Sequence, residues 1–511
     1  MAGAHYSNAD HATMHCLCGN FQYLWQKFRI SLMKVQSLIR VSVLLATVLA
    51  SPGAGATLPE SVAQLMQANS IALNSISVVI RRVGSQGSQI THQSRTPRNP
   101  ASVMKLVTTA AALNLLGTQH RWQTEVLIDG TLRDDTLHGD LILRGGGDPW
   151  LVIERFWLLA RQLRERGLTH IQGNLVLDDS LFDRKAIGRK AIDGKHQRSY
   201  NTLPSALLVN FGATSLVFDS RMGRLAVHAD PAATTLRLVN SVKQDKTNCA
   251  NRLHRITLES TTHTQQTDVQ LGGTYPANCG QSTLRRTLLP HGQYVYGVFK
   301  ALWQELGGTL SGNWVYGKTP TQAKVLGTLD SVFLTDVIRH TNKFSNNVMA
   351  RNILLTLASE FSLTPATPAK GAKVIENWLD ASGVLMPALR IDNGAGLSRD
   401  ARLSAAGLAT LLEKATAEPW WPEFVGSLPI ATVDGSLRRR FYGIARPGRL
   451  RLKTGLLRDV RTLAGYAIDP SGNTWVIVIL HNHPRATDAV GIEIQHKLLE
   501  TLFQNQPREA S

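Results

Sequence analysis

Apolar and polar residues alternate over residues 76–83, the first clear structural pattern in the chain. A period of two is typical of a half-buried strand, and the Gly- and Ser-containing segment that follows favours a turn and a returning strand over residues 88–94. Apolar residues then continue from Leu106 to Leu115, until Gly117 supplies a stop. The pattern therefore predicts a β-hairpin followed by an apolar helix.

Turn residues punctuate the middle of the chain. Between residues 211 and 275, alternating Val, Leu and Thr with many turn residues predict a small β-rich unit. Around it, the patterns predict strands over 122–128, 138–144 and 174–177, and helices over 150–165 and 295–306.

The last third of the chain combines helices with three strands. Apolar residues at helical spacing predict helices over 334–340, 348–359, 372–379 and 489–503, and strands are predicted over 450–453, 462–468 and 473–481. We expect the three late strands and the early hairpin to form one antiparallel sheet with helices on both faces.

A chain of 511 residues is too long for one ordinary core, so more than one domain is expected. The chain leaves the first domain after the apolar helix and returns before the helix at 334–340. We predict a leader over 1–56 with a signal peptide at 33–56; a main domain of 57–122 and 326–511; an inserted domain of 123–210 and 276–325; and a nested small β-rich domain of 211–275.

The leader has the pattern of an export signal. Residues 34–40 carry basic side chains, residues 41–50 are apolar, and the Ala-Gly-Ala sequence ending at Ala56 resembles a cleavage site. The apolar run is too short for a permanent membrane anchor. We expect export with cleavage near Ala56, and a start at Met33 rather than Met1 would give a signal peptide of ordinary length.

Basic side chains exceed acidic ones throughout the chain. The formal net charge is +18, and because the leader holds four Lys or Arg and one Asp, the remainder carries +15. There is no Lys and Arg run with interleaved aromatic residues and no recognised nucleic-acid module, so no nucleic-acid partner is expected. For an exported protein this charge favours peripheral contact with an anionic membrane or envelope polymer.

Two cysteines, Cys249 and Cys279, remain once the leader is set aside. An oxidising compartment would allow them to pair, which makes them a disulfide candidate, and two unpaired thiols are the alternative. On the chain-entropy model the closed loop would stabilise the fold by about 3–4 kcal/mol.

Ser102 and Lys105 form a Ser-x-x-Lys sequence at the predicted start of the apolar helix. Asn99 can cap the first turn and Pro100 suits its first position, which places Ser102 in that turn. Residues three apart share one helix face, so the hydroxyl meets a candidate base beside the positive end of the helix dipole. The spacing also arises by chance, as it does at Ser31.

Two later segments supply further polar groups. Ser345 and Asn347 form a Ser-x-Asn sequence at a helix junction, and residues 453–455 are Lys-Thr-Gly at the end of a predicted strand. The Ser-x-Asn sequences that begin at Ser311 and Ser471 lie in predicted surface turns. Ser-x-x-Lys on a helix, Ser-x-Asn between helices and Lys-Thr-Gly on a strand, in that order, form the penicillin-recognising serine acyltransferase set.

No metal or cofactor is expected. His481 and His483 are two residues apart, but no third ligand or Glu-bearing helix accompanies them, so we interpret them as a strand end. No nucleotide loop or dinucleotide fingerprint stands in a convincing context.

The three motifs give the chain a resemblance to the class C low-molecular-mass penicillin-binding proteins, the D-alanyl-D-alanine carboxypeptidase/endopeptidase family. Residues 392–399 resemble that family's Asp-Asn-Gly-Ser-Gly-Leu-Ser-Arg segment, and residues 145–149, 200–207 and 463–466 are also similar. The resemblance implies an α/β (α+β) fold class: a five-stranded antiparallel sheet flanked by helices, as in serine β-lactamases and penicillin-binding transpeptidases. Two β-rich domains would be inserted between the Ser-x-x-Lys and Ser-x-Asn motifs.

The resemblance also implies a catalytic role for three residues. Ser102 would attack the carbonyl between two terminal D-alanines, with neutral Lys105 as the base. Ser345 would relay protons, and Asn347 would hold the substrate amide. Lys453 would help to depress the pKa of Lys105.

The Lys-Thr-Gly strand is implied to bind the substrate. Lys453, Thr454 and Gly455 would lie beside the terminal carboxylate, and the backbone amides of Ser102 and Leu456 would form the oxyanion hole. The family usually has Thr or Ser where this chain has Leu456, so we expect a weaker grip on that carboxylate.

Two charged residues are matched to recognition of the peptide stem. By motif, Asp179 and Arg399 correspond to the family's contacts to the diaminopimelate side chain. A surface carboxylate and a structural salt-bridge arginine are the alternatives.

The sequence thus predicts a periplasmic serine carboxypeptidase and endopeptidase that acts on peptidoglycan muropeptides through a Ser102 acyl-enzyme. β-Lactam antibiotics would be its inhibitors. A serine β-lactamase and a non-catalytic cell-wall binding protein on the same fold are the alternative functions.

Overall fold

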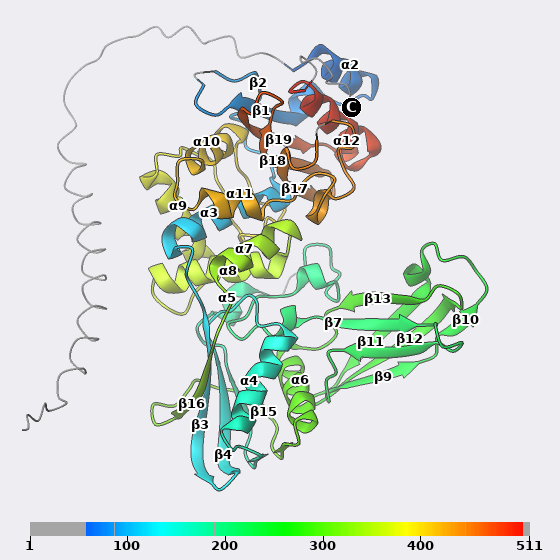
Figure 1. The fold of residues 1–511 in the computed structure, drawn as a ribbon, viewed down its shortest axis with the longest axis vertical. Coiled ribbons are helices and arrows are strands. Elements are labelled where there is room, and N and C mark those ends of the chain that lie inside the picture. Colours follow the sequence, from blue (N-terminus) through cyan, green and yellow to red (C-terminus); the bar gives the residue numbers. More distant parts are fainter. Residues whose placement is uncertain (1–57, 86, 189–190, 445, 504–511) are drawn as a thin grey trace, which may run out of the picture. The chain divides into compact units, whose positions relative to one another are not determined.

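The computed structural model describes residues 58–503, apart from residues 86, 189–190 and 445 (Figure 1). The predicted signal peptide, its cleavage near Ala56 and the choice of Met33 as the start lie outside the described residues. Within the described part of the chain, every helix is too short or too polar to cross a lipid bilayer.

Five strands form one sheet in the order β17-β18-β19-β1-β2, and every neighbouring pair is antiparallel. This confirms the predicted sheet, because the three late strands join the early hairpin through β19 and β1. The bounds are β1 Ile76–Arg82, β2 Ile90–His92, β17 Leu450–Leu457, β18 Val460–Ile468 and β19 Thr474–Asn482.

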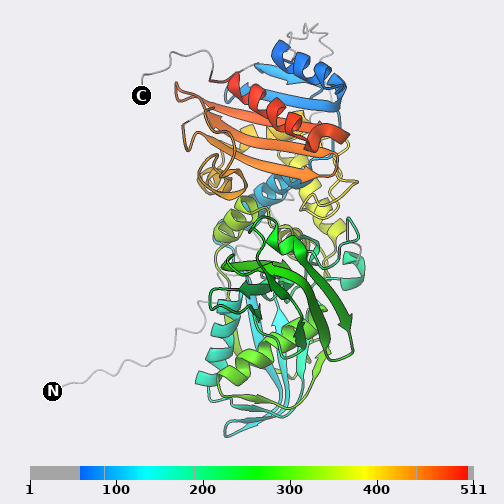
Figure 2. The ribbon, with the colours of Figure 1, turned by 90° about the vertical axis from the view of Figure 1, so that its right-hand side faces the viewer.

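Alternation along β1 divides the main domain into two cores. Val78 and Ile80 contribute to the core that contains α2 and α12, whereas Val79 contributes to the core that contains α3 and the remaining helices. Figure 2 shows α12, in red, lying across one face of the orange strands. The bounds are α2 Glu60–Ala68, α3 Met104–Leu116, α7 Leu334–Lys343, α8 Asn347–Phe361, α9 Pro368–Ala381, α10 Ala405–Ala415, α11 Trp421–Ser427 and α12 Ala489–Glu500.

The start of the apolar helix differs from its prediction. A 3-10 helix, Ala101–Val103, precedes α3, so Pro100 is not the first residue of the α-helix. Asn99 Oδ1 accepts a hydrogen bond from the Ala101 amide, while Asn99 Nδ2 donates to the Ser398 carbonyl. Asn99 therefore ties the turn to another loop as well as capping it. Ten of the thirteen α3 residues are buried, which explains why apolar residues occur on every side of the helix.

A second sheet dominates the chain between α3 and α7. Its order is β14-β5-β4-β3-β16, with β6 paired to β4 and β15, and the helices α4 and α6 share its core. The bounds are β3 Gln123–Arg133, β4 Thr136–Gly145, α4 Ile153–Glu165, β5 His170–Ile171, β6 Leu175–Asp178, α5 Arg184–Ile187, α6 His291–Glu305, β14 Thr309–Leu310, β15 Trp314–Tyr316 and β16 Lys324–Asp330.

Two smaller sheets lie within residues 214–286, so they extend beyond the nested unit predicted at 211–275. One has the order β13-β7-β8, and in the other β12 pairs with β9, β10 and β11. Cys249 and Cys279 form a disulfide in this region. The domain boundaries themselves stay a prediction. The bounds are β7 Thr214–Asp219, β8 Ala226–Asp230, β9 Leu236–Asn240, β10 Lys243–Asp245, β11 Ile256–Thr262, β12 Thr267–Pro276 and β13 Gln281–Arg286.

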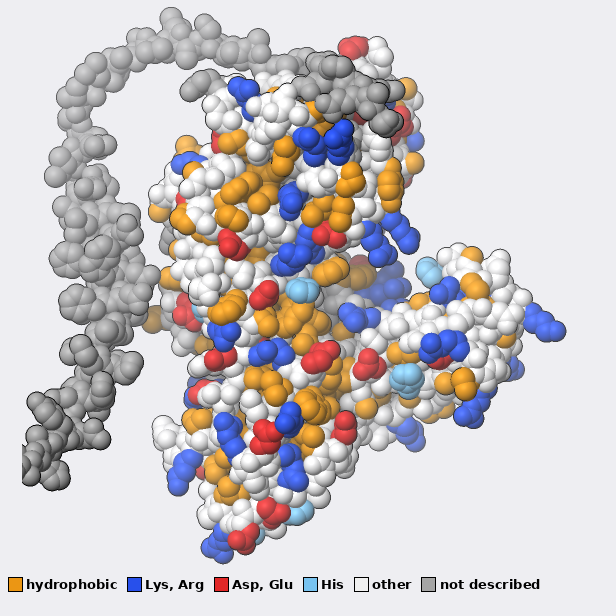
Figure 3. Space-filling view, in the orientation of Figure 1, with side chains coloured by type: hydrophobic (Ala, Val, Ile, Leu, Met, Phe, Trp, Pro, Cys, Tyr) orange, Lys and Arg blue, Asp and Glu red, His pale blue; other side chains and the backbone are white. Residues whose placement is uncertain are grey.

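Charged side chains are spread over the face of the molecule shown in Figure 3, with acidic side chains among the basic ones. The expected contact with an anionic membrane or envelope polymer stays a prediction.

Candidate active site

Ser102 lies in the 3-10 turn, which packs directly against the strands β17 and β18. Thr462 on β18 donates its hydroxyl to the Pro100 carbonyl at 2.7 Å. A Cβ at Gly455 would lie 2.7 Å from the Pro100 carbonyl oxygen and 2.1 Å from the Thr462 hydroxyl. Glycine in the Lys-Thr-Gly motif therefore lets the strand approach the turn that carries Ser102.

A second glycine, in the loop that contains residues 392–399, approaches the same turn. Gly396 has a φ of +71°, and a Cβ there would lie 1.8 Å from the Ala101 carbonyl oxygen. Ala101 itself has a φ of +46°, a conformation rarely adopted by residues with a side chain. Contacts from two directions thus hold the turn in a strained geometry.

Lys105 is fully buried, and its Nζ contacts three oxygen atoms. Nζ lies 3.1 Å from Ser102 Oγ, 2.7 Å from Asn347 Oδ1 and 2.7 Å from the Ala395 carbonyl. Burial, together with the positive charges of Lys453 and Arg351, holds the pKa of Lys105 well below its usual value. In its uncharged form the amine would have two N–H groups for the amide and carbonyl oxygens, which would leave its lone pair for the Ser102 hydroxyl.

Lys453 is the second fully buried amine of the site. Its Nζ donates to Ser345 Oγ at 2.8 Å and to the Thr454 carbonyl at 2.9 Å, and burial lowers its pKa to about 7. Ser345 has a φ of +56° at the junction of α7 and α8, where Asn346 caps α8 by accepting from the Met349 amide.

One cavity of about 590 Å³ collects most of the predicted site residues. Lys105 and Lys453 are buried and do not line the cavity, and Gly455 packs against the turn that carries Ser102. Leu456 is 59% exposed at the cavity, so its side chain leaves that part of the wall apolar. The predicted residues among the lining are Ser102, Ser345, Asn347, Arg399, Thr454 and Leu456.

Asp179 does not line this cavity. It is only 6% exposed, accepts a 3.4 Å hydrogen bond from Ser205 and pairs with Arg184 at 3.6 Å. Ser205 in turn contacts His291 Nε2 at 3.0 Å. The carboxylate therefore belongs to a buried polar network in the inserted region, beside separate cavities.

Asp193 lines the Ser102 cavity together with Arg399 and was missed by the sequence reasoning. Its carboxylate accepts from the Tyr200 hydroxyl at 2.5 Å and from Asn201 Nδ2 at 2.8 Å, and these bonds hold its pKa at about 2. Tyr200 and Asn201 belong to the segment that carried the resemblance. Their spacing to Asp193 gave no recognisable pattern, because the carboxylate lies in an irregular loop.

His481 and His483 have ring centroids 6.1 Å apart. Within residues 58–503, leaving out 86, 189–190 and 445, no group of three His, Cys, Asp or Glu side chains is placed to hold a metal ion.

Comparison with known proteins covers nearly the whole described chain. The model of the D-Ala-D-Ala carboxypeptidase 3 (S13) family matches residues 58–503. The D-alanyl-D-alanine carboxypeptidase of Actinomadura sp. (strain R39) is 28% identical over 400 residues, covering 75% of this chain and 73% of the relative. The D-alanyl-D-alanine carboxypeptidase DacB of Haemophilus influenzae is 25% identical over 377 residues, covering 73% and 78%.

Solved structures give the same fold. The crystal structure of penicillin binding protein 4 (dacB) from Haemophilus influenzae has a TM-score of 0.72 at 22% identity, covering 86% of this chain and 99% of that chain. The same protein complexed with a novel β-lactam has a TM-score of 0.68 at 22% identity, covering 87% and 99%. The predicted fold class is confirmed.

Proposed function

The chain belongs to the D-Ala-D-Ala carboxypeptidase 3 (S13) family, and from this premise we propose that Ser102 is the nucleophile of a serine-type hydrolase. The surroundings of Lys105 carry the proposal. Two of its three oxygen contacts, Asn347 Oδ1 and the Ala395 carbonyl, can only accept hydrogen bonds, and the third is the Ser102 hydroxyl. Such an arrangement suits a neutral amine that accepts the serine proton.

In the proposed acylation, Lys105 takes the Oγ proton while Ser102 Oγ bonds to the carbonyl carbon between two terminal D-alanines. The C–N bond then breaks, the proton held by Lys105 passes through Ser345 to the leaving nitrogen, and D-alanine departs. Water then attacks the ester carbonyl while the neutral Lys105 accepts a proton from it. The C–Oγ bond breaks, the proton on Lys105 passes to Ser102 Oγ, and the shortened peptide leaves as a carboxylic acid. Ser345 suits this relay because its hydroxyl is hydrogen-bonded to the Lys453 amine.

Lys453 and Thr454 are proposed to bind the terminal carboxylate. Lys453 carries the charge, and Thr454 Oγ1 lies at the cavity, 2.9 Å from the Ser436 hydroxyl. The backbone amides of Ser102 and Leu456 would stabilise the developing oxyanion. The exposed leucine side chain adds no hydrogen bond to the carboxylate.

Asp193 and Arg399 are proposed to recognise the side chain of the peptide stem. They place a carboxylate and a guanidinium on the wall of the same cavity, complementary to a side chain that bears both an ammonium and a carboxylate group, as diaminopimelate does. Arg399 Nη1 donates to the Arg458 carbonyl at 2.9 Å, which fixes one end of the guanidinium. We therefore propose Asp193, in place of the expected Asp179, as the acidic contact.

The remaining parts of the function follow from the family and from the leader. We propose that the protein is exported to the periplasm, that its substrates are peptidoglycan stem peptides and cross-links, and that β-lactams acylate Ser102. The Haemophilus influenzae structure complexed with a β-lactam supports the last step. Cleavage of cross-links would make the enzyme an endopeptidase as well as a carboxypeptidase.

Labelling with a fluorescent penicillin tests the nucleophile. Ser102→Ala should abolish covalent labelling and lower turnover by about four to six orders of magnitude. Ser311→Ala is the matched control, because Ser311 is an exposed Ser-x-Asn serine outside the cavity and its variant should label normally. Retained labelling of the Ser102 variant would overturn the assignment.

Digestion of purified muropeptides tests the reaction. Release of D-alanine measures carboxypeptidase activity, and conversion of dimers to monomers measures endopeptidase activity. Binding of peptidoglycan without acylation of the unaltered protein would instead favour a non-catalytic cell-wall protein. A penicillin adduct that hydrolyses within seconds would favour a β-lactamase.

A further inference from the structure

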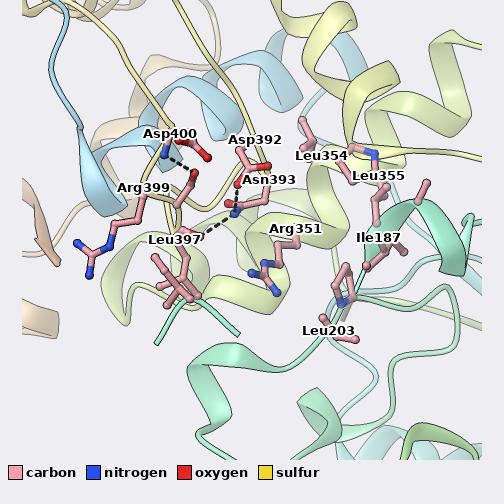
Figure 4. A pocket seen from close by; sticks show the side chains of 16 residues that line it. Ile187, Leu203, Arg351, Leu354, Leu355, Asp392, Asn393, Leu397, Arg399 and Asp400 are labelled. Atoms are coloured by element: carbon pink, nitrogen blue, oxygen red, sulfur yellow. Dashed lines mark hydrogen bonds between the residues drawn. The ribbon is translucent and has the colours of Figure 1, made fainter. Parts of the chain in front are cut away.

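Arg351 is a half-buried cation beside the proposed catalytic site. It lies on α8, four residues after Asn347, so the two side chains occupy the same face of the helix. Figure 4 shows Arg351 pointing into a cavity between Leu397 and Leu203. This cavity of about 420 Å³ adjoins the one that contains Ser102, because Ile192, Leu397 and Arg399 line both.

The Arg351 guanidinium has few hydrogen-bond partners and no nearby anion among the described residues. Its Nη1 donates to the Thr202 carbonyl at 3.1 Å, but its buried Nε has no hydrogen-bond partner. Among the described residues, no carboxylate oxygen lies within 4.0 Å of Arg351. Asp392, the acidic residue whose charge acts on it, is exposed and accepts from Asn393. Burial without a close anion is unfavourable for a charged group.

The position of Arg351 matters because of Lys105. Asn347 Oδ1 accepts from Lys105 Nζ, so the face of α8 that carries Arg351 also contacts the proposed base. The charged side chains that act on Lys105 within the described chain are Lys453, from β17, and Arg351, from α8. The segment that contributes the Ala395 carbonyl also carries Asp392, whose charge acts on Arg351.

We propose that Arg351 is a positioning residue that keeps Lys105 in its uncharged, proton-accepting state. This inference rests on the proposed acylation of Ser102. A second positive charge near an amine makes protonation of that amine less favourable, which preserves the lone pair that faces Ser102 Oγ. Lys453 also contributes this repulsion, but its own charge fades as the pH rises through about 7. The ordinary pKa of an arginine is far above this range. Arg351 therefore stays positive there even though burial lowers its pKa.

A purely structural role is the competing explanation. Through Thr202, Arg351 tethers α8 to the inserted region, and loss of that hydrogen bond would disturb the cavity wall. The two explanations differ in pH dependence. Loss of the tether lowers the acylation rate at every pH. Loss of the charge instead raises the pKa of Lys105, so the acid limb, the pH range in which the rate falls as Lys105 becomes protonated, moves to higher pH.

The test is the rate of penicillin acylation of the full chain between pH 4 and 9 for Arg351→Gln and Arg351→Lys. The Gln variant should move the acid limb upward by about one pH unit, which lowers the rate about tenfold on that limb. The Lys variant should retain the original limb, because it retains the charge. Arg390→Gln removes an equal charge from an exposed position and should leave the profile unchanged.

The outcomes distinguish failure of the role proposed for Arg351 from failure of the proposed function. An unmoved acid limb in Arg351→Gln, with a lower plateau, would overturn the role of the charge and support the tether. A limb that moves equally in the Lys variant would also overturn it. Absence of Ser102 labelling in the unaltered protein would overturn the proposed function itself. Circular dichroism and melting temperature identify any variant that fails to fold, and in that event Arg351→Met at the same position repeats the comparison.

Discussion

Lys453 Nζ donates a 2.8 Å hydrogen bond to Ser345 Oγ, although the lysine is fully buried and, among the described residues, has no carboxylate partner. The proposed relay serine is therefore attached to the cation that is proposed to hold the substrate carboxylate. Protonation of Lys453 consequently affects both substrate binding and proton delivery.

We predict an alkaline limb in kcat/KM near the pKa of Lys453, which is about 7. The charged amine attracts a terminal carboxylate, and deprotonation removes that attraction as the pH rises through this value. Steady-state hydrolysis of a peptide ending in D-Ala-D-Ala between pH 5 and 10 measures the limb. A matching substrate that ends in a carboxamide is the control and should show a weaker limb, because only the proton-delivery effect of Lys453 remains. An identical limb for both substrates would contradict the assignment.

Leu456→Thr should strengthen binding of the substrate carboxylate. Leu456 is 59% exposed, so replacement removes little packing, and a hydroxyl here can add one hydrogen bond to a charged group. We expect KM to fall about three- to tenfold for the acid substrate. The carboxamide substrate should show a smaller change. A KM that is unchanged for the acid would show that this position does not contact the carboxylate.

Asp193→Asn should weaken recognition of a stem that carries diaminopimelate. The variant retains the shape of the side chain but removes its charge, and we expect KM to rise about tenfold for this stem. A stem with an uncharged residue at the same position should be affected less. Equal losses with both stems would indicate that Asp193 only supports the loop through Tyr200 and Asn201.

Asp179→Asn is the counterpart of that experiment. Asp179 contacts Ser205 and Arg184 in a buried network, so the variant should lower the melting temperature without changing the preference between the two stems. A changed preference between the two stems would instead support the expected role of Asp179 in recognising the peptide stem.

Removal of the disulfide should affect stability and leave catalysis intact. The double variant Cys249→Ser, Cys279→Ser opens a loop whose ends are 30 residues apart, and the free energy of unfolding should fall by about 3 kcal/mol. Chemical denaturation with and without reductant measures this difference. Penicillin acylation at 25 °C should not change, because the bond lies outside the Ser102 cavity.

The main sheet could be predicted because its strands are short runs rich in apolar and β-branched residues that are bounded by turn residues. The order of the three motifs likewise predicted that Ser102, Ser345 and Thr454 share a cavity. The 3-10 turn before α3 could not be read from local sequence. Its geometry depends on Gly396 and Gly455, which approach Ala101 from distant parts of the chain.

The roles of the charged residues around the cavity also could not be predicted from local sequence. Asp179 follows a predicted strand and lies in a motif, so local sequence favoured it over Asp193, which lies in a loop. Arg351 continues the face of a predicted helix and carries no pattern of its own. Its effect on Lys105 arises only when α3 and α8 pack together, which is a property of tertiary structure.

The pairing of the early and late parts of the chain has a consequence for folding during synthesis. Asn99 and Asn482 exchange hydrogen bonds across 383 positions, and β1 pairs with β19 along its whole length. The early hairpin therefore lacks its neighbouring strand until residue 482 has been synthesised, whereas the intervening sheets can complete their pairings sooner. The turn that carries Ser102 contacts β17 and β18, so it cannot complete these contacts until the late strands have been made, and a shorter nascent chain would carry Ser102 without its surroundings.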